Sequence, residues 1–501
     1  MTDELCTLTS PLPHAAGKDR PLLALTIVWH PDIERVGEQF VAAEQSSGWE
    51  VSRYAPLFRR AGGPELPLGH SGISREPLRI TRDTDDNVSV HFPNTKMVIE
   101  LNSCVVQGSV RLIKSQIDTG QLLTLGRAVV LCLHWMTVLP KPGAIAAVTG
   151  VGSAAIMLRD QIRMAAASDL PVLLMGETGT GKEIAARAIH ALSRRAHASL
   201  VTVNMAALNE ALAAADLFGA AKGAYTGAQS ERKGLFAEAD GATLFLDEIG
   251  NAPASVQPML LRVLEGGDYR PLGAAHDRQA TARLIAASDQ NLDSVDFNQA
   301  LLRRLEGFVI QLPPLRQRRE DIGVLIVELL GKDAGRRLPS ALVLALACYD
   351  WPGNIRQLAR ALQRALLMLD AGTAPQFAQL VRVPSHPPDQ PGHAPATVAG
   401  PTGAVPARRK PSSLSHQDIL DAMGRHGWTI QHAAHALGIS RPTLYKLLER
   451  HPEIRRAEQI PVDDIKRALF SSNGDVERCA ALLKTPAEPL RRLLHKHELV
   501  D

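Results

Sequence analysis

The stretch Gly176-Glu177-Thr178-Gly179-Thr180-Gly181-Lys182-Glu183 decides how the central part of this chain folds. An apolar run at residues 172–175 precedes it, and a helical pattern follows at residues 184–192. A strand, a glycine loop and a helix in this order surround phosphate oxygens with backbone N–H groups, and the lysine reaches the β- and γ-phosphates. We therefore expect ATP to bind at residues 176–183, although Glu183 stands where most such loops carry Ser or Thr. A chance glycine turn before a helix is the competing interpretation.

Composition limits the class of protein. The 501 residues allow about three to four domains, and 45% apolar residues can bury large cores. The net charge of +3 names no partner, and 4% aromatic residues argue against RNA or sugar binding by stacking. Five widely spaced cysteines lack metal-ligand spacing, which favours free thiols in a reducing cytoplasm. Neither a membrane-length apolar run nor a signal-peptide pattern is apparent, so we expect a cytoplasmic protein without a membrane partner.

A pair of carboxylates follows a second apolar strand pattern. Residues 242–246 read as a buried strand that ends in Asp247-Glu248. A carboxylate at a strand end can hold Mg²⁺, and a second one can polarise the attacking water of phosphoryl transfer. We assign Asp247 to Mg²⁺ and Glu248 to water activation. An acidic pair that caps a helix after a strand is the alternative.

Between these motifs lies Gly223-Ala224-Tyr225-Thr226-Gly227-Ala228, in which small residues flank one aromatic ring and one hydroxyl group. That composition suits a mobile loop with a single adhesive tip. With this motif the chain resembles bacterial enhancer-binding proteins, the NtrC-like activators of sigma-54 RNA polymerase, whose AAA+ domain touches sigma-54 through a GAFTGA loop. Tyr225 replaces the usual Phe. The resemblance covers residues 150–383 and implies ATPase activity, a hexameric ring and a sigma-54 contact at residues 223–228.

The same resemblance assigns further positions. Asn204 matches the asparagine that links the catalytic Glu to the sigma-contacting loop, and residues 264–273 match a second surface loop. Residues 351–358 match the lid motif, which would bring Arg356 to the phosphates. An arginine that only packs the helical lid is the alternative for Arg356.

Two departures from the family pattern concern catalysis. Asp289 puts an acid where the family's first sensor has an amide. Of the two arginines that the family supplies to a neighbouring subunit, Arg304 matches the second, but Asn298 replaces the first. Because such arginine fingers are worth about 10³–10⁵ in rate, we expect either a low ATPase rate or compensation by Arg303.

The N-terminal region reads as strands broken by turns. Residues 1–20 resemble a loose tail, and short strands at 23–27, 88–92, 98–101 and 122–133 predict a β-sandwich over residues 21–140. A helical pattern stands out only near residues 35–44. The Ser74-Arg75 pair makes the region similar to a forkhead-associated domain, although Pro77 replaces the family's His. The resemblance implies phosphothreonine binding by Ser74, Arg75 and an upstream arginine, Arg59 or Arg60. Arginines that are merely solvated are the alternative.

The C-terminal region contains an internal repeat. Residues 384–412 are rich in Pro, Gly and Ala and predict a semi-extended linker with a basic cluster at 408–410. Beyond it, apolar residues recur at an offset of 46, so that Ile419 matches Ile465 and Leu444 matches Leu490. Each unit reads as three helices with a short turn before the third, which is helix-turn-helix spacing. The first unit resembles the Fis-type DNA-binding module of enhancer-binding proteins.

Basic residues mark the expected DNA contacts. Recognition residues lie near the start of the third helix, which nominates Arg441, Thr443, Tyr445 and Lys446 in unit one and Arg491 and Arg492 in unit two. Residues 406–501 carry 16 Lys and Arg against 12 Asp and Glu, so the chain's basic excess lies where DNA contact is expected. A bundle that only packs or dimerises remains the alternative for unit two.

Together these patterns predict a multidomain chain. We expect a tail (1–20), a forkhead-associated-like β-sandwich (21–140), an α/β AAA+ P-loop ATPase (150–315) with a helical lid (316–383), a linker (384–412) and an all-α tandem helix-turn-helix region (413–501). The expected function is a sigma-54-dependent activator that binds upstream double-stranded DNA and remodels the polymerase closed complex with ATP. A nucleotide-gated DNA-binding regulator with weak or no ATPase activity, or an ATPase acting on another client, are the alternatives.

Overall fold

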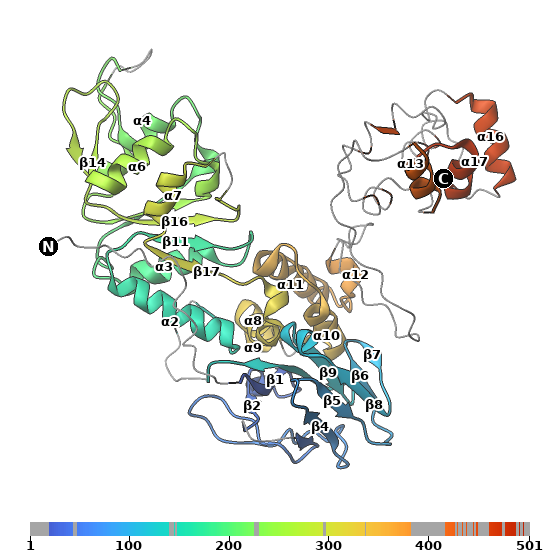
Figure 1. Ribbon diagram of the computed structural model, residues 1–501. Helices are drawn as coiled ribbons and strands as arrows, with labels where there is room; N and C mark the ends of the chain where they lie inside the picture. The colour runs from blue at the N-terminus through green and yellow to red at the C-terminus, as the bar shows by residue number, and fades with distance from the viewer. Residues whose placement is uncertain are drawn as a thin grey trace. The chain divides into compact units, whose positions relative to one another are not determined.

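The computed structural model describes residues 20–381, apart from 44–47, 140–144, 146–147, 225–229, 294–296 and 336. It then describes residues 416–425, 460–472 and 476–486, together with single positions between 428 and 494. Two units result, Met1–Pro388 and Asp389–Asp501 (Figure 1). Within the described parts, no helix is long and apolar enough to cross a membrane.

The N-terminal domain consists of two antiparallel sheets. The larger sheet has the order β2-β1-β10-β9-β6-β7, and the smaller has the order β3-β4-β5-β8. Their strands are β1 (Leu22–Trp29), β2 (Gln39–Val41), β3 (Gly48–Val51), β4 (Leu78–Arg82), β5 (Val88–His91), β6 (Ile99–Leu101), β7 (Cys104–Val105), β8 (Ser109–Leu112), β9 (Gln121–Leu125) and β10 (Val129–Met136). Leu25 and Leu131 from one sheet and Ile80 and Val90 from the other share one core, as expected for a sandwich.

The segment near residues 35–44, whose type the sequence left open, forms no α-helix over residues 35–43. This segment forms one 3-10 turn, Ile33–Arg35, followed by the edge strand β2. Gly37 lies between them at a φ of +90°, where a helix cannot continue. The domain's one α-helix among the described residues is the short α1 (Lys114–Asp118), which the apolar pattern did not indicate.

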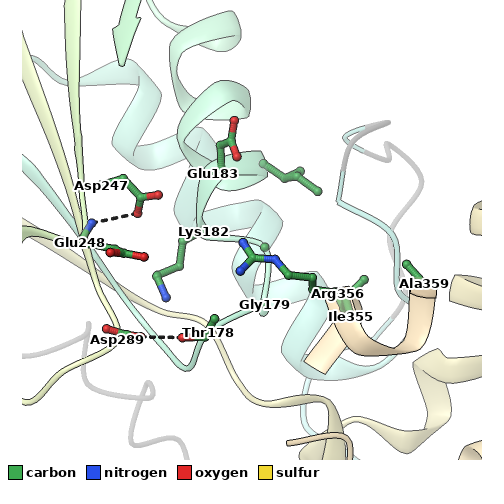
Figure 2. Close-up of a pocket in the computed structure, with 12 residues that line it drawn as sticks. Thr178, Gly179, Lys182, Glu183, Asp247, Glu248, Asp289, Ile355, Arg356 and Ala359 are labelled. Atoms are coloured by element: carbon green, nitrogen blue, oxygen red, sulfur yellow. Dashed lines mark hydrogen bonds between the residues drawn. The ribbon is translucent and has the colours of Figure 1, made fainter. Parts of the chain in front are cut away.

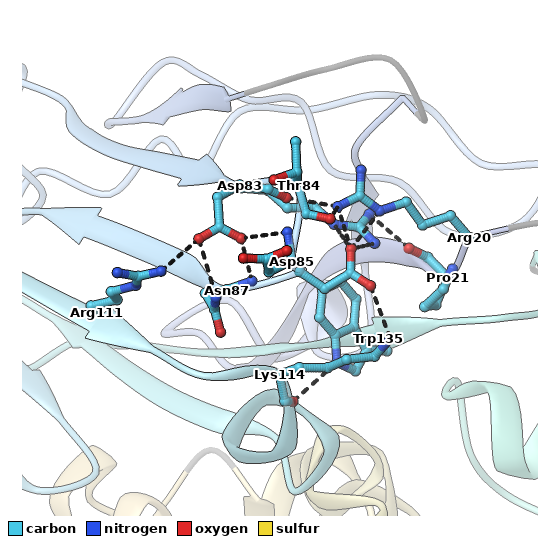
Figure 3. Close-up of polar contacts among 11 residues, drawn as sticks. Arg20, Pro21, Asp83, Thr84, Asp85, Asn87, Arg111, Lys114 and Trp135 are labelled. Carbon is cyan, nitrogen blue, oxygen red and sulfur yellow. Dashed lines mark hydrogen bonds and ion pairs between the residues drawn. The ribbon is translucent and has the colours of Figure 1, made fainter.

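An ion-pair cluster fastens the start of β1 to the turn between β4 and β5 (Figure 3). Asp86 accepts hydrogen bonds from Arg20, from Arg82 at 2.7 Å and from Lys114 at 2.9 Å. Burial alone would raise the pKa of Asp86, but these three cations together lower it to about 2. Because the Asp86 carboxylate is engaged by donors of its own domain, this acidic turn stabilises the domain's fold.

The larger sheet is buried on both of its faces. Along β10, Leu131 and Leu133 point into the sandwich, whereas Val130 and Cys132 belong to a second core that includes helices of the lid. Along β1, Val28 joins this second core while Ile27 faces the sandwich. This shared core joins the N-terminal domain to α8 (Ile322–Leu330) and α10 (Ser340–Cys348), which lie over β1 and β9 in Figure 1.

The central domain is a five-stranded parallel sheet in the order β12-β13-β16-β11-β17. The strands are β11 (Val172–Met175), β12 (Leu200–Asn204), β13 (Thr243–Asp247), β16 (Arg283–Ser288) and β17 (Phe308–Gln311). The helices are α2 (Ser153–Ala167), α3 (Lys182–Leu192), α4 (Ala213–Phe218), α5 (Leu235–Glu238), α6 (Gln257–Gly266) and α7 (Gln299–Leu305), and a small ribbon pairs β14 (Asp268–Tyr269) with β15 (Arg278–Gln279). Helices α2 and α3 pack on one face of the sheet and α6 and α7 on the other (Figure 1). Because the strands are parallel, their carboxyl ends lie together at one edge of the sheet.

The lid and the C-terminal unit are helical. The lid contains α8 (Ile322–Leu330), α9 (Lys332–Gly335), α10 (Ser340–Cys348), α11 (Asn354–Asp370) and α12 (Phe377–Leu380). The C-terminal unit contains α13 (His416–Arg425), α16 (Val462–Ser471) and α17 (Val476–Leu483). One buried cluster there takes matched residues from both halves of the repeat, including Ile419 with Ile465 and Leu444 with Leu490.

Candidate functional site

The glycine loop, residues 176–183, joins β11 to α3. Gly179 and Gly181 adopt φ values of +81° and +105°, which side chains rarely tolerate, and Gly181 caps α3. Lys182 is the first residue of that helix, and its ammonium group donates to the backbone oxygens of Gly176 at 2.7 Å and Glu177 at 3.2 Å. The loop therefore places a cation and a helix N-terminus at the carboxyl end of the sheet, where anions bind.

Two carboxylates face this loop from the end of β13. Burial raises the pKa of Asp247, whereas the hydrogen bond from the Glu248 N–H lowers it; the charge of the Glu248 carboxylate raises it and that of Lys182 lowers it. Glu248 has a left-handed φ of +54°, and its N–H donates to the Asp247 carboxylate at 3.0 Å. A non-glycine residue in this conformation is held there by its surroundings, as is common at functional sites.

A cleft of about 210 Å³ joins these groups to the lid. Figure 2 shows the side chains of Lys182, Asp247 and Glu248 facing the same space as Arg356 from α11. The cleft is lined by Thr178, Gly179, Gly181, Lys182, Glu183, Ile184, Asp247, Glu248, Asp289, Ile355, Arg356 and Ala359. Most of the ATP-site residues nominated from the sequence therefore meet in one place. Gly176, Glu177 and Thr180 belong to the loop but do not line the cleft.

Asp289 reaches the glycine loop directly. The hydroxyl group of Thr178 donates to the Asp289 carboxylate at 2.5 Å (Figure 2). Burial lowers the pKa of Lys182, while Asp289 and Asp247 raise it. The acid at this sensor position thus adds negative charge where phosphate is expected.

Asn204 ends β12 and lies opposite Asp247 in the parallel register. Its side-chain oxygen accepts from the N–H of Ala206 at 2.9 Å and caps a short 3-10 turn. Among the described residues, no hydrogen bond joins Asn204 to Glu248. The link from Asn204 to the catalytic Glu stays a prediction.

The positions predicted to supply arginines to a neighbouring subunit lie at and along α7, and none of them lines the cleft. Arg304 pairs with Glu265 at 3.4 Å, and Arg303 pairs with Glu306 at 3.2 Å. Asn298 caps α7, because its side-chain oxygen accepts from the N–H groups of Ala300 and Leu301. Asn298, which replaces the first arginine, therefore stabilises the N-terminus of α7.

Only the base of the loop predicted to contact sigma-54 is described. Gly223 and Ala224 are placed, whereas Tyr225, Thr226, Gly227 and Ala228 lie outside the described residues. The N–H of Ala221 donates to the oxygen of Leu272 at 2.8 Å, so the loop's base is attached to residues 264–273, the second surface loop. The DNA candidates Arg441, Thr443, Tyr445, Lys446, Arg491 and Arg492 also lie outside the described residues.

The N-terminal domain does not bring the nominated arginines to Ser74. Arg59 pairs with Glu65 at 3.1 Å, and Arg60 donates to backbone oxygens of Glu34 and Val36. Arg53 was missed by the sequence reasoning. Its guanidinium donates to the oxygens of Ile73 at 3.0 Å and Ser71, and its N–H donates to the oxygen of Ser74 at 3.1 Å. The signal was its place just after β3, the strand that pairs with β4 beyond Ser74. Arg75 is exposed beside it.

Three residues that contact the glycine loop from outside the cleft were not assigned these contacts from the sequence. Arg316 and Asn354 bond to the carboxylate of Glu177, and Arg318 donates to the backbone oxygen of Thr180 at 3.3 Å. All three belong to segments that begin the lid or its helix α11. Polar residues at helix starts are common, so the sequence offered no signal for these contacts.

Comparison with known proteins accounts for this arrangement. Residues 148–311 match the sigma-54 interaction domain, residues 316–389 the AAA+ ATPase lid domain, and residues 414–451 the Fis family of bacterial regulatory proteins. The transcriptional regulatory protein ZraR of Salmonella typhimurium is 40% identical over 330 residues, which cover 62% of this chain and 70% of ZraR. The nitric oxide reductase transcription regulator NorR2 of Cupriavidus necator is 37% identical over 325 residues, 60% of this chain and 62% of NorR2.

A crystal structure of NtrX from Brucella abortus in complex with ADP shares 26% identity and has a TM-score of 0.43, over 62% of this chain and 70% of that chain. Family identity rests instead on the matched domains and on ZraR. The chain belongs to the sigma-54-dependent transcriptional regulators, and its central domain is an AAA+ ATPase.

Proposed function

We propose that ATP hydrolysis in the cleft drives the loop at residues 223–228 against sigma-54 and remodels the closed promoter complex. The convergence of Lys182 and Arg356 with Asp247 and Glu248 in one cleft carries this proposal. Phosphoryl transfer needs cations that neutralise the phosphates and a carboxylate that orients the attacking water, and the cleft supplies both.

Each residue of the cleft has a distinct task in this proposal. Lys182 binds the β- and γ-phosphates, Arg356 contacts them from the lid, and Glu248 takes up hydrogen bonds from the attacking water. The oxygen ligands at the end of β13 suit Mg²⁺, which Asp247 would hold and which would neutralise phosphate charge.

Assembly into a hexameric ring completes the site. Arg304 is exposed and lies outside the cleft of its own chain, so it is free to approach the nucleotide of a neighbouring subunit. Its pairing with Glu265 is an exposed contact of low strength, which assembly can exchange for a phosphate. Asn204 would report the state of Glu248 to the surface loop.

The N-terminal domain acts as the sensor of this ATPase. Its sheet shares a core with α8 and α10, so a change in the domain reaches the lid through packed side chains. Arg53, Ser74 and Arg75 offer guanidinium and hydroxyl groups on one loop, which suit a phosphothreonine of a partner protein. The pairing of Arg53 with two backbone oxygens supports a positioned arginine rather than a freely solvated one.

The C-terminal unit binds the upstream DNA site. In this proposal Arg441, Thr443, Tyr445 and Lys446 read bases, and Arg491 and Arg492 bind phosphate. Arg441→Ala should lower affinity for the cognate site more than for random DNA, whereas the Arg491→Ala/Arg492→Ala variant should weaken both equally and flatten the salt dependence. A salt titration of both variants on both DNAs would expose the reverse division of labour.

A regulator with little ATPase activity is the second candidate. The bond from Thr178 to Asp289 and the capping role of Asn298 favour it, because both departures fall on positions that support catalysis in the family. It would bind ATP to assemble on DNA without remodelling the polymerase.

In vitro transcription from a sigma-54 promoter, with and without ATP, separates the two candidates. The wild type should need hydrolysable ATP. Lys182→Ala should lose ATP binding, and Glu248→Gln should bind ATP but hardly hydrolyse it. Thr226→Ala should keep hydrolysis and lose activation. Retained ATP binding without activation by the wild type would establish the second candidate, whereas full activation by Glu248→Gln would refute the need for hydrolysis.

A further inference from the structure

Glu177 belongs to the glycine loop but does not line the cleft. Its carboxylate accepts two hydrogen bonds from Arg316, at 2.8 Å and 2.5 Å, and a third from the Asn354 side chain at 3.1 Å. The bond from Arg316, more than the one from Asn354, lowers the pKa of Glu177, so the group is an anion at neutral pH. The carboxylate is thus engaged by lid residues.

Asn354 is the other half of this contact. It is fully buried, it begins α11, and it holds a left-handed φ of +49°, a conformation that Asn adopts more readily than most residues. Its side-chain oxygen accepts from the N–H of Leu315 at 2.7 Å, and its side-chain nitrogen donates to Glu177 and to the oxygen of Thr178 at 3.1 Å. One amide therefore ties together the glycine loop, the start of the lid and the start of α11.

Close packing reinforces these bonds. A Cβ atom added to Gly179 would overlap the backbone oxygen of Gly353 and lie 3.1 Å from the Cβ of Arg356. The loop and the first turn of α11 therefore touch at backbone distance. Arg356, two residues beyond Asn354, projects from that same turn into the cleft (Figure 2).

We propose that Glu177 is a positioning residue that fastens the lid to the glycine loop through Arg316 and Asn354 and thereby sets Arg356 against the phosphates. The inference rests on the proposed ATP site and adds that Glu177 acts through Arg356 without contacting nucleotide. Because arginine must meet phosphate oxygens within a fraction of an ångström, loosening α11 removes the benefit of Arg356 while the residue itself remains.

A double-mutant cycle on the full chain tests this coupling. Glu177→Gln, Arg316→Gln and Arg356→Ala should each lower kcat/KM for ATP by roughly 10- to 100-fold. Combining Glu177→Gln with Arg356→Ala should cost no more than the worse single variant, because both remove the same contact. Arg337→Gln, which breaks the exposed lid pair Arg337–Asp370, is the matched control and should change nothing.

The alternatives give different results. Additive losses in the cycle would show that Glu177 acts independently of Arg356, and a loss in Glu177→Gln that Arg316→Gln lacks would show direct contact with nucleotide. Either result overturns the proposal. Thermal unfolding of each variant shows whether it folds. If Glu177→Gln misfolds, the milder change Arg316→Gln, at a half-buried residue, decides. Failure of Lys182→Ala to abolish ATP binding would instead refute the proposed ATP site itself.

Discussion

Gly323 in α8 lies directly against β1 of the N-terminal domain. A Cβ atom at this position would overlap the backbone oxygen of Val28 in β1 and lie 2.8 Å from its carbonyl carbon. In the helix itself, Gly323→Ala is favourable by about 1 kcal/mol, because alanine has the higher helix propensity. The two effects have opposite signs, so the variant distinguishes a docked N-terminal domain from an undocked one.

The size of the effect follows from the contact. The overlap is with backbone, which cannot rotate away as a side chain can, so β1 has to move off α8. Overpacking of this kind costs about 1–3 kcal/mol. If docking and undocking are in equilibrium, that cost shifts the equilibrium by about 5- to 150-fold towards the undocked state.

Cys132 supplies the assay. It lies in β10, it is fully buried in the shared core, and burial raises the pKa of its thiol well above the usual range. Gly323→Ala should increase the rate at which a thiol reagent labels Cys132 by about the same 5- to 150-fold, as measured by peptide mass spectrometry. Cys479, which is buried in the other unit, is the internal reference and should not change.

Gly266→Ala is the matched control variant. Gly266 is also helical, and an added Cβ there would meet nothing closer than 3.7 Å, so this change should leave Cys132 protected. Labelling of Cys132 at the wild-type rate in Gly323→Ala, together with a rise in stability, would show that β1 does not rest on α8.

Three further changes probe charged and capping residues. Burial, assisted by repulsion from Asp321, raises the pKa of Glu320 from 4.5 to about 8. Between these pH values the folded chain keeps a proton on Glu320 that the unfolded chain loses. The free energy of unfolding therefore falls as pH rises through this window. Glu320→Gln should reduce the fall in the free energy of unfolding between pH 4.5 and about 8, as measured by urea unfolding at both pH values. Asp289→Asn removes a negative charge beside the phosphates and should tighten ATP binding on the order of tenfold in a titration, and an unchanged affinity would contradict the electrostatic role. Asn298→Arg should raise ATP turnover of the assembled ring while costing about 0.5–2 kcal/mol of stability through the lost helix cap; unchanged turnover would indicate that Arg303 already serves.

The convergence of the glycine loop and the Asp247-Glu248 pair on one cleft was predictable because its determinants are local. Glycines at fixed spacing before Lys182 dictate one loop conformation, and the carboxylate at the end of β13 must face that loop because parallel strands end at one edge of the sheet. Local pattern also located strands of the sandwich. Along residues 88–92 apolar and polar side chains alternate, which indicates a half-buried strand without reference to distant parts of the chain.

Contacts between distant segments escaped the sequence reasoning for a physical reason. A hydrogen bond from Asn354 to Glu177 needs no particular spacing in the chain, so any buried amide and any carboxylate could have formed it. Arg53 was missed because strand pairing between β3 and β4, rather than proximity in sequence, brings it to Ser74. The family pattern suggested an arginine upstream of Ser74 but not which one.

The sequence does contain a signal for the shared core, in the two long strands of the larger sheet. Residues 22–29 and 129–136 are almost continuously apolar, whereas a sheet with one wet face alternates. Strands that are apolar at nearly every position indicate that both faces of the sheet are buried. Here the lid buries the face that points away from the sandwich core. The pattern could have predicted a buried outer face, but not which segment of the chain buries it.

The shared core and the contacts of Glu177 meet in one short segment of the lid. Residues 315–318 hold the glycine loop through Arg316 and Arg318, and the next three residues, Arg319–Asp321, pack beneath β1 and β10. A movement of the N-terminal domain away from the lid would therefore act on a turn that is directly continuous with the residues contacting Glu177 and Thr180. If this turn transmits the signal, Gly323→Ala should also lower kcat/KM for ATP, and Arg316→Gln should make ATPase activity insensitive to Gly323→Ala. Independent, additive effects of the two variants would show that the domain controls the ATPase by another route.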